Sequence, residues 1–368
     1  MIISDHHIIT RDINSVLIIQ LGDIGDLVWT TPTLWAVKEA YPHANISVLL
    51  REGLRHLLES DPVIHKIFEV KNNRGSLSSS SIAQLRLIKE LRQEHFDLVV
   101  DLRGGDRGAF MARLTGAPVR ASLFYDDAPF WRNRLFTHLL IEPTPPKERI
   151  LGAAEQSLRI IRGFGIDVKR TVPRLLVSDQ AMKKAHQILM KAGIKQEVSD
   201  TSYHWVTINP FSRWAYKEWA YDKWVGVIDW LWDEFHIAAV IVGSGEEAAR
   251  AAQLVKKCSG AVYSLAGKTT LAELAGVLSL SRLHLGVDSA APHVAAAVGT
   301  PTITIYGPTD WRDWAPVGDN HRVIVSDMDC VPCYKKGCNG SERSMCLENL
   351  EVTTVEDVIR EELKKISR

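Results

Sequence analysis

Short apolar runs alternate along the chain with stretches in which apolar residues recur at helical spacing, in both halves of the sequence. The apolar runs predict strands, namely Val16–Leu21, Ile46–Leu50, Lys66–Val70, Leu98–Leu102, Val119–Leu123, Trp205–Asn209, Ala238–Val242, Val262–Leu265, Leu283–Val287 and Thr302–Tyr306. The stretches between them predict helices, namely Thr31–Ala40, Gly53–Glu59, Ile82–Glu94, Asp179–Ala192, Tyr221–Glu234, Glu246–Lys257, Leu271–Leu278, Ala291–Val298 and Thr354–Lys365. This alternation is typical of parallel sheets covered by helices on both faces.

The alternation is interrupted between Lys169 and Thr201, and 368 residues are too many for one ordinary core. We therefore expect two α/β domains, residues 1–178 and 179–368, each a doubly wound, Rossmann-like parallel sheet. The carboxyl ends of their strands are expected to face a central cleft, and the last helix is a candidate to pack back on the first domain. Three segments predict loops or irregular structure: Asn72–Ser81, which is rich in Ser and Gly, Asp126–His138 and Pro143–Arg149.

Composition narrows the function classes. Lys and Arg total 44, as do Asp and Glu, so the formal net charge is zero and nothing in the overall charge favours binding to nucleic acid. No apolar run reaches the roughly 20 residues of a membrane-spanning helix, and residues 1–10 lack the basic start of a signal peptide. These features predict a cytoplasmic protein.

The most informative motif runs from Leu285 to Gly299, where a predicted strand ends on Asp288 and Ser289 and an alanine-rich helix follows Pro292 and His293. In open parallel sheets, ligands bind beyond the carboxyl ends of strands and at the helix N-termini that follow. A carboxylate, a hydroxyl, backbone N–H groups and an imidazole at such a position suit a sugar and a phosphate together. The alternative is a tight turn with Asp288 and Ser289 as N-caps.

A second motif, Gln20–Pro32, follows the first predicted strand and holds Gly22, Gly25 and Asp26. The glycine spacing is not that of a dinucleotide-binding loop, and Asp23 and Asp26 would repel a pyrophosphate. A carboxylate at this strand end suits a general base. The alternative is that Asp26 only caps the following helix.

A loop after the strand Trp205–Asn209 contains Ser212, Arg213 and Lys217. A hydroxyl and cations at this place suit a diphosphate, whose charge they would neutralise as a phosphate ester departs. The alternative is a solvated loop, which we consider less favoured for Lys217.

Glu247 follows the strand Ala238–Val242 in the turn Gly243-Ser-Gly-Glu-Glu247. A carboxylate there could hold a ribose diol. It could equally complement the dipole of the helix that begins at this point.

The chain has five cysteines, and four lie in a late cluster, Cys330, Cys333, Cys338 and Cys346. Such thiols could bind zinc or an iron–sulfur cluster, although the spacing is not common for a zinc ribbon. Reduced structural or reversibly oxidised thiols are the favoured alternative.

Taken in order, these motifs resemble those of a known family, the ADP-heptose:lipopolysaccharide heptosyltransferases of glycosyltransferase family nine. The resemblance covers about Val16 to Val358. Its elements are Gly25-Asp-Leu-Val-Trp-Thr-Thr-Pro32, Lys217-Glu-Trp219, Gly243–Glu247, Asp288–His293, Gly299-x-Pro301, Tyr306-Gly-Pro-Thr309 and the Cys-x-Pro-Cys element Cys330–Cys333. Two departures affect donor preference: Ala290 stands where Gly is usual, and Ser244-Gly245 replaces Gly-Pro.

The resemblance implies a GT-B fold and an inverting, metal-independent transfer without a cofactor. It places a nucleotide-sugar donor, ADP-heptose, in the C-terminal domain and a lipopolysaccharide inner-core acceptor in the N-terminal domain. The enzyme would then touch the cytoplasmic face of the inner membrane peripherally. Two other classes stay open at this point: a nucleotide-sugar epimerase of the same architecture, and a non-catalytic nucleotide-sugar-binding protein.

The same resemblance assigns roles to residues. Asp26 is the expected base for the acceptor hydroxyl, and Lys217 is expected to stabilise the departing diphosphate. The remaining expected donor contacts are Ser212, Arg213, Glu247, Asp288, Ser289, Ala290 and His293. Independently of the resemblance, the candidate contacts to acidic groups of the acceptor are Arg51, Arg103, Arg107 and Arg120. The alternative is that these arginines are simply solvated.

Overall fold

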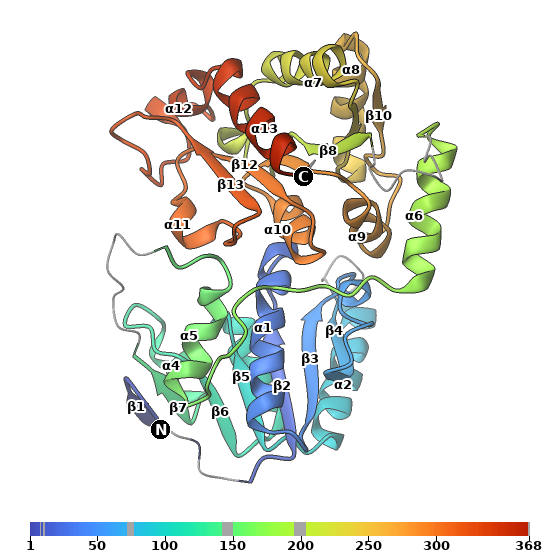
Figure 1. Ribbon diagram of the computed structural model, residues 1–368. Helices are drawn as coiled ribbons and strands as arrows, with labels where there is room; N and C mark the ends of the chain where they lie inside the picture. Colours follow the sequence, from blue (N-terminus) through green and yellow to red (C-terminus); the bar gives the residue numbers. More distant parts are fainter. Residues whose placement is uncertain (8, 10–11, 72–76, 142–149, 195–203, 367–368) are drawn as a thin grey trace. The chain divides into compact units, whose positions relative to one another are not determined.

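A computed structural model describes residues 1–7, 9, 12–71, 77–141, 150–194 and 204–366 (Figure 1). The chain forms two compact units, Met1–Leu176 and Val177–Arg368. Each unit contains one sheet, and all strand pairings within the described residues are parallel.

The first unit is built on a seven-stranded sheet in the order β1-β7-β6-β5-β2-β3-β4. Its strands are β1 (Ile2–Ser4), β2 (Ser15–Gln20), β3 (Asn45–Arg51), β4 (Ile64–Val70), β5 (Leu98–Asp101), β6 (Val119–Leu123) and β7 (His138–Leu140). Its helices are α1 (Ile24–Ala40), the 3₁₀ helix η1 (Arg55–Leu57), α2 (Leu77–Gln93), α3 (Asp106–Thr115), α4 (Phe130–Arg134) and α5 (Glu155–Gly163). The chain proceeds outward from β2 in both directions, so the gap between β2 and β5 is the topological switch point at which such sheets bind ligands.

The second unit has a six-stranded sheet in the order β10-β9-β8-β11-β12-β13. Its strands are β8 (Trp205–Asn209), β9 (Ala238–Ile241), β10 (Val262–Ser264), β11 (His284–Val287), β12 (Thr302–Tyr306) and β13 (His321–Val325). Its α-helices are α6 (Asp179–Lys191), α7 (Tyr221–Phe235), α8 (Ala248–Lys257), α9 (Leu271–Ser279), α10 (Ala290–Ala297), α11 (Trp311–Trp314), α12 (Met345–Glu348) and α13 (Val352–Ile366). Its 3₁₀ helices are η2 (Ala215–Lys217), η3 (Gly245–Glu247) and η4 (Cys338–Gly340). Here the switch point lies between β8 and β11.

Tryptophans anchor the core of the second unit. Trp219 and Trp224 are almost fully buried and meet edge to face with their ring centroids 5.2 Å apart. Helix α6 packs on α9, and α13 packs on α7, where Arg360 and Glu234 form an ion pair at 2.7 Å. These contacts of the last helix, α13, lie within the second unit.

The two doubly wound parallel sheets confirm the predicted fold class, and every predicted strand is present. Sequence reasoning missed the short strands β1 and β7 and the partly exposed β13. It also placed the start of α1 at Thr31, although the helix begins at Ile24. That helix is buried nearly all round from Gly25 to Val37, so its sequence has no amphipathic spacing.

Three predicted irregular or helical segments need correction. The predicted helix Gly53–Glu59 is only the single 3₁₀ turn η1. The Ser-rich segment Asn72–Ser81 is helical from Leu77, since α2 begins there, and residues 72–76 lie outside the described residues. Asp126–His138 contains α4 and the start of β7, while 143–149 also lies outside the described part of the chain.

Candidate active site

Asp26 lies in the first turn of α1, directly after the carboxyl end of β2. One carboxylate oxygen, Oδ2, accepts the backbone N–H of Asp23 at 2.9 Å, and the other, Oδ1, is ion-paired with Arg103. Gly22 makes this position possible, because a Cβ there would lie 2.5 Å from the Asp26 side chain. Asp26 therefore does cap the helix, but one oxygen faces a cation at the switch point, where a base would be needed.

Three of the four arginines proposed for the acceptor lie at this same edge of the sheet. Arg103 follows β5, and Arg51 ends β3 and is ion-paired with Asp23. Arg107, in the first turn of α3, donates to the Lys71 carbonyl at 2.8 Å. Partial burial and the nearby positive charge of Arg51 lower the pKa of Arg107. The edge around Asp26 thus gathers three guanidinium groups, two of them paired with aspartates.

Arg120, the fourth candidate, does not lie with this group. It lies near the amino end of β6, at the opposite edge of the sheet. Its guanidinium donates to the carbonyls of Leu135 and Ala117. These contacts tie β6 to the segment before β7, so they explain Arg120 by structure alone.

Behind the edge lies a buried polar pair that sequence reasoning missed. Asp101, at the end of β5, is 1% exposed, and its Oδ1 accepts the backbone N–H of Arg103 at 3.2 Å. Arg132, in α4, is 2% exposed and donates to the Gly104 carbonyl at 2.6 Å. Burial raises the pKa of Asp101 to about 6, against the lowering effect of backbone N–H groups and of Arg132. Together the pair fixes the turn that carries Arg103 toward Asp26.

In the second unit, the predicted donor residues converge where β8 and β11 end. Lys217 Nζ lies 2.6 Å from Asp288 Oδ2, and both side chains are largely buried. The Ser212 hydroxyl donates to the Asp288 carbonyl at 3.3 Å, and the Ser289 hydroxyl donates to Asn209 Oδ1 at 3.2 Å. Asn209 was not among the predicted site residues, although it ends a predicted strand.

The contacts of Ser289 differ from those of a capping side chain. Ser289 occupies the N-cap position of α10, but its hydroxyl makes no capping hydrogen bond and donates to Asn209 instead. Ala290, the first residue of α10, has no positive φ, so the expected glycine is not required by the backbone. The first turn of α10 therefore keeps its backbone N–H groups available for an anion.

Two buried rings lie close to Asp288. Burial lowers the pKa of His293 to about 4, so its imidazole is neutral near pH 7 and can donate only one hydrogen bond. The Tyr306 hydroxyl is buried without a hydrogen-bond partner among the described residues, and burial followed by the charge of Asp288 raises its pKa. The sequence analysis includes Tyr306 in the element Tyr306–Thr309 but gives it no role in the site, because it ends an apolar strand like a core residue.

Two further predicted donor contacts, Glu247 and Arg213, lie in places that local structure alone can account for. Glu247 Oε2 accepts the backbone N–H of Ser244 at 2.6 Å, which closes a capping box, and Oε1 lies 3.8 Å from Arg250. Arg213 is exposed in the loop after β8. Neither position contradicts a role in donor binding, and neither requires one.

The four clustered cysteines are free thiols in the structure. Cys346 is buried, and burial raises the pKa of its thiol to about 11, with the three other cysteines adding to this effect. Within the described ranges, no group of three or more His, Cys, Asp or Glu side chains is arranged to hold a metal ion. Nor is any helix in that part of the chain long and apolar enough to cross a bilayer.

Solved structures define the class of protein first. A glycosyl transferase family 9 structure from Veillonella parvula matches 96% of this chain and 99% of its own, with a TM-score of 0.80 and 20% identity. The structure of E. coli ADP-heptose lps heptosyltransferase II matches 96% and 100%, with a TM-score of 0.74 and 18% identity. The fold is therefore GT-B, with two Rossmann-like domains.

Sequence comparison then identifies the family. The family model described as glycosyltransferase family 9 (heptosyltransferase) matches residues 84–342. Lipopolysaccharide heptosyltransferase 3 of Escherichia coli is 33% identical over 302 residues, which cover 79% of this chain and 84% of the relative. The chain belongs to glycosyltransferase family 9. This confirms the resemblance of its motifs and makes it a glycosyltransferase rather than an epimerase.

Proposed function

We propose that this enzyme transfers heptose from ADP-heptose to the inner core of lipopolysaccharide, with inversion at the anomeric carbon. The names of its relatives support the donor sugar and the acceptor. The observation that carries the proposal is the donor edge of the second unit, where α10 begins beside the ion pair of Lys217 and Asp288 and the N-cap residue Ser289 makes no capping hydrogen bond. Such an edge suits a sugar diphosphate.

In the donor site, Lys217 and the N-terminus of α10 both act on the diphosphate. Lys217 and the first N–H groups of α10 stabilise the negative charge that develops on the departing diphosphate. Asp288 orients hydroxyls of the sugar, with Ser212, Ser289 and neutral His293 beside it. Glu247 holds the ribose and Arg213 reaches the phosphates from the loop. Because protein groups supply the positive charge, the reaction requires neither a metal ion nor a cofactor.

In the acceptor site, Asp26 takes the proton of the attacking hydroxyl. The carboxylate oxygen it would use is the one paired with Arg103. An acidic group of the acceptor that binds Arg103 would release this oxygen, so acceptor binding and activation of the base are linked. Arg51 and Arg107 bind further acidic groups. The first unit thus acts as the acceptor domain at the cytoplasmic face of the inner membrane, with peripheral contact only.

A donor panel tests this function. The purified enzyme is incubated in EDTA with a truncated lipopolysaccharide acceptor and ADP-heptose, ADP-glucose or UDP-glucose, and the product is analysed by mass spectrometry and NMR. We expect one added heptose, of inverted anomeric configuration, from ADP-heptose. Transfer from another donor, or a retained configuration, would refute the donor or the mechanism. Release of free or epimerised sugar without an acceptor product would refute transfer altogether.

A further inference from the structure

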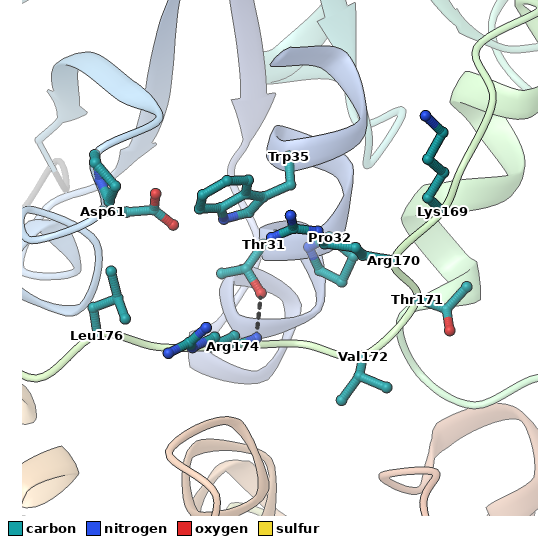
Figure 2. A pocket seen from close by; sticks show the side chains of 11 residues that line it. Thr31, Pro32, Trp35, Asp61, Lys169, Arg170, Thr171, Val172, Arg174 and Leu176 are labelled. Atoms are coloured by element: carbon teal, nitrogen blue, oxygen red, sulfur yellow. Dashed lines mark hydrogen bonds between the residues drawn. The ribbon is translucent and has the colours of Figure 1, made fainter. Parts of the chain in front are cut away.

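A pocket of about 490 Å³ lies within the first unit, between α1, the turn that contains Asp61 and the segment 169–176 (Figure 2). None of the residues proposed for the donor or the acceptor lines it. It is within the size range of small-molecule sites. Thr31, in its wall, is five residues after Asp26 on α1, which is about 7.5 Å along the helix axis.

Much of the surface inside this pocket is apolar, and two of its polar side chains, Thr31 and Asp61, already have partners. Trp35, Pro32 and Val172 supply ring and aliphatic surface. The Thr31 hydroxyl accepts the backbone N–H of Arg174 at 3.0 Å, a bond that holds the segment 169–176 on α1 (Figure 2). Asp61 accepts the Val63 N–H at 3.0 Å and a hydrogen bond from Trp35. With Thr31 and Asp61 engaged in this way, the apolar surface suits a hydrocarbon chain.

The rim of the pocket is basic. Lys169, Arg170 and Arg174 line it, and the buried Asp61 is the one carboxylate among the lining residues. Arg170 lies over the Trp35 ring at 4.7 Å and 3.4 Å from Glu39. Lys169 is exposed and makes no hydrogen bond or ion pair within the described part of the chain. An apolar interior with a basic rim is complementary to a hydrocarbon chain that ends in an anionic group.

We propose that this pocket binds an acyl chain with an adjacent phosphate, supplied by the lipid part of the acceptor. The assignment to the acceptor rests on the proposed function, because an acceptor on lipopolysaccharide brings acyl chains and acidic groups to the enzyme together. Pro32, Trp35 and Val172 contact the acyl chain. Lys169 and Arg170 bind the phosphate.

Direct binding tests the chemistry without relying on catalysis. Octyl, decyl and dodecyl phosphate are titrated calorimetrically into the full-length protein below their critical micelle concentrations, with inorganic phosphate and dodecyl maltoside as comparisons. Affinity should rise up to about fourfold per methylene group that enters the pocket. Equal affinity for the three chain lengths, or equally tight binding of dodecyl maltoside, would overturn the proposal.

Matched variants locate the binding. Val172 is 60% exposed and Val317 in the second unit is 48% exposed, so neither substitution by Asp should unfold the protein. Val172→Asp should lower the affinity for dodecyl phosphate by about tenfold or more, because a charge enters the apolar wall, while Val317→Asp should not. Lys169→Glu should weaken binding and the control Lys183→Glu on α6 should not. Identical effects within either pair of variants would rule out this pocket.

Turnover measurements then test whether the bound acyl chain belongs to the acceptor. With the wild-type enzyme, KM for an acylated truncated acceptor should be lower than KM for its deacylated form, and Val172→Asp should abolish that difference at unchanged kcat. An unchanged KM difference in Val172→Asp would show that the acceptor lipid does not use the pocket. Absence of transfer to both acceptors would instead refute the proposed function, and the alkyl phosphate titration would still report on the pocket.

Discussion

Replacing Asp26 by Asn separates the two tasks of this side chain. The amide oxygen that the substitution introduces can still accept the N–H of Asp23, as Asp26 Oδ2 does at 2.9 Å, so the start of α1 should persist. The ion pair with Arg103 is lost, but the two side chains are 20% and 48% exposed, and such pairs contribute at most about 1 kcal/mol. The proton acceptor is lost completely, which should lower kcat by about 100- to 10,000-fold.

The assay measures ADP release and heptose transfer at saturating donor and acceptor, with thermal unfolding and calorimetric donor binding on the same preparations. Donor affinity should not change, because the donor residues belong to the second unit. Asp23→Asn is the matched control, since it removes a neighbouring carboxylate that pairs with Arg51 and has no role as a base. We expect less than about a tenfold loss there. A turnover of Asp26→Asn within about threefold of wild type would remove Asp26 from the mechanism.

Three further predictions test the buried charged groups Lys217 and Asp101 and the independence of the reaction from metal ions. Lys217→Ala should weaken ADP-heptose binding and lower kcat, because Asp288, 2.6 Å from Lys217, then loses its ion-pair partner and the diphosphate lacks its cation. Lys183→Ala on α6 is the control. An equal loss in Lys183→Ala, or an unchanged donor affinity and kcat in Lys217→Ala, would contradict this. Asp101 has a folded-state pKa of about 6, above its ordinary value, so the folded protein binds its proton more tightly. The contribution of Asp101 to stability should therefore fall as pH rises from about 4 to about 6, and the difference in unfolding free energy between wild type and Asp101→Asn should follow that fall; a difference independent of pH would refute it. Activity should survive EDTA. Loss of activity that Mg²⁺ or Mn²⁺ restores would contradict this and point to Asp327 and Asp329, which form an Asp-x-Asp element of the kind that holds such ions. Restoration by Zn²⁺ alone would instead point to a structural site at the thiols.

The architecture could be predicted from the sequence because the central strands are nearly continuous apolar runs. Strands of this kind are buried on both faces, and the helices between them fix a parallel sheet. The pattern is weak where an element is at an edge or is surrounded by protein. β13 is an edge strand with His321 and Arg322 among its residues, and α1 is buried nearly all round. Neither shows the alternation or the amphipathic spacing on which sequence-based prediction depends.

The candidate site also contains residues that the sequence predicts and residues that it does not. Asp26, Lys217 and Asp288 could be predicted because strand ends of a doubly wound sheet converge, and polar residues there are conspicuous in a sequence. Arg120 differs from these residues, because the predicted strand Val119–Leu123 already puts it at the amino end, away from Asp26, while the sequence does not show which groups its guanidinium binds. It lies one residue after the start of that strand, and its partners are carbonyls of Ala117 and Leu135.

The residues behind the site could not be predicted, since neither is part of a motif that the sequence sets apart. Asp101 ends a buried strand, and Arg132 lies in a segment that predicts no element. Their importance arises only in three dimensions, where Asp101 binds the N–H of Arg103 and Arg132 binds the carbonyl of Gly104. Arg103 in turn holds Asp26. A change at either buried residue should therefore act on the base through one turn of backbone, although neither residue contacts the reacting groups.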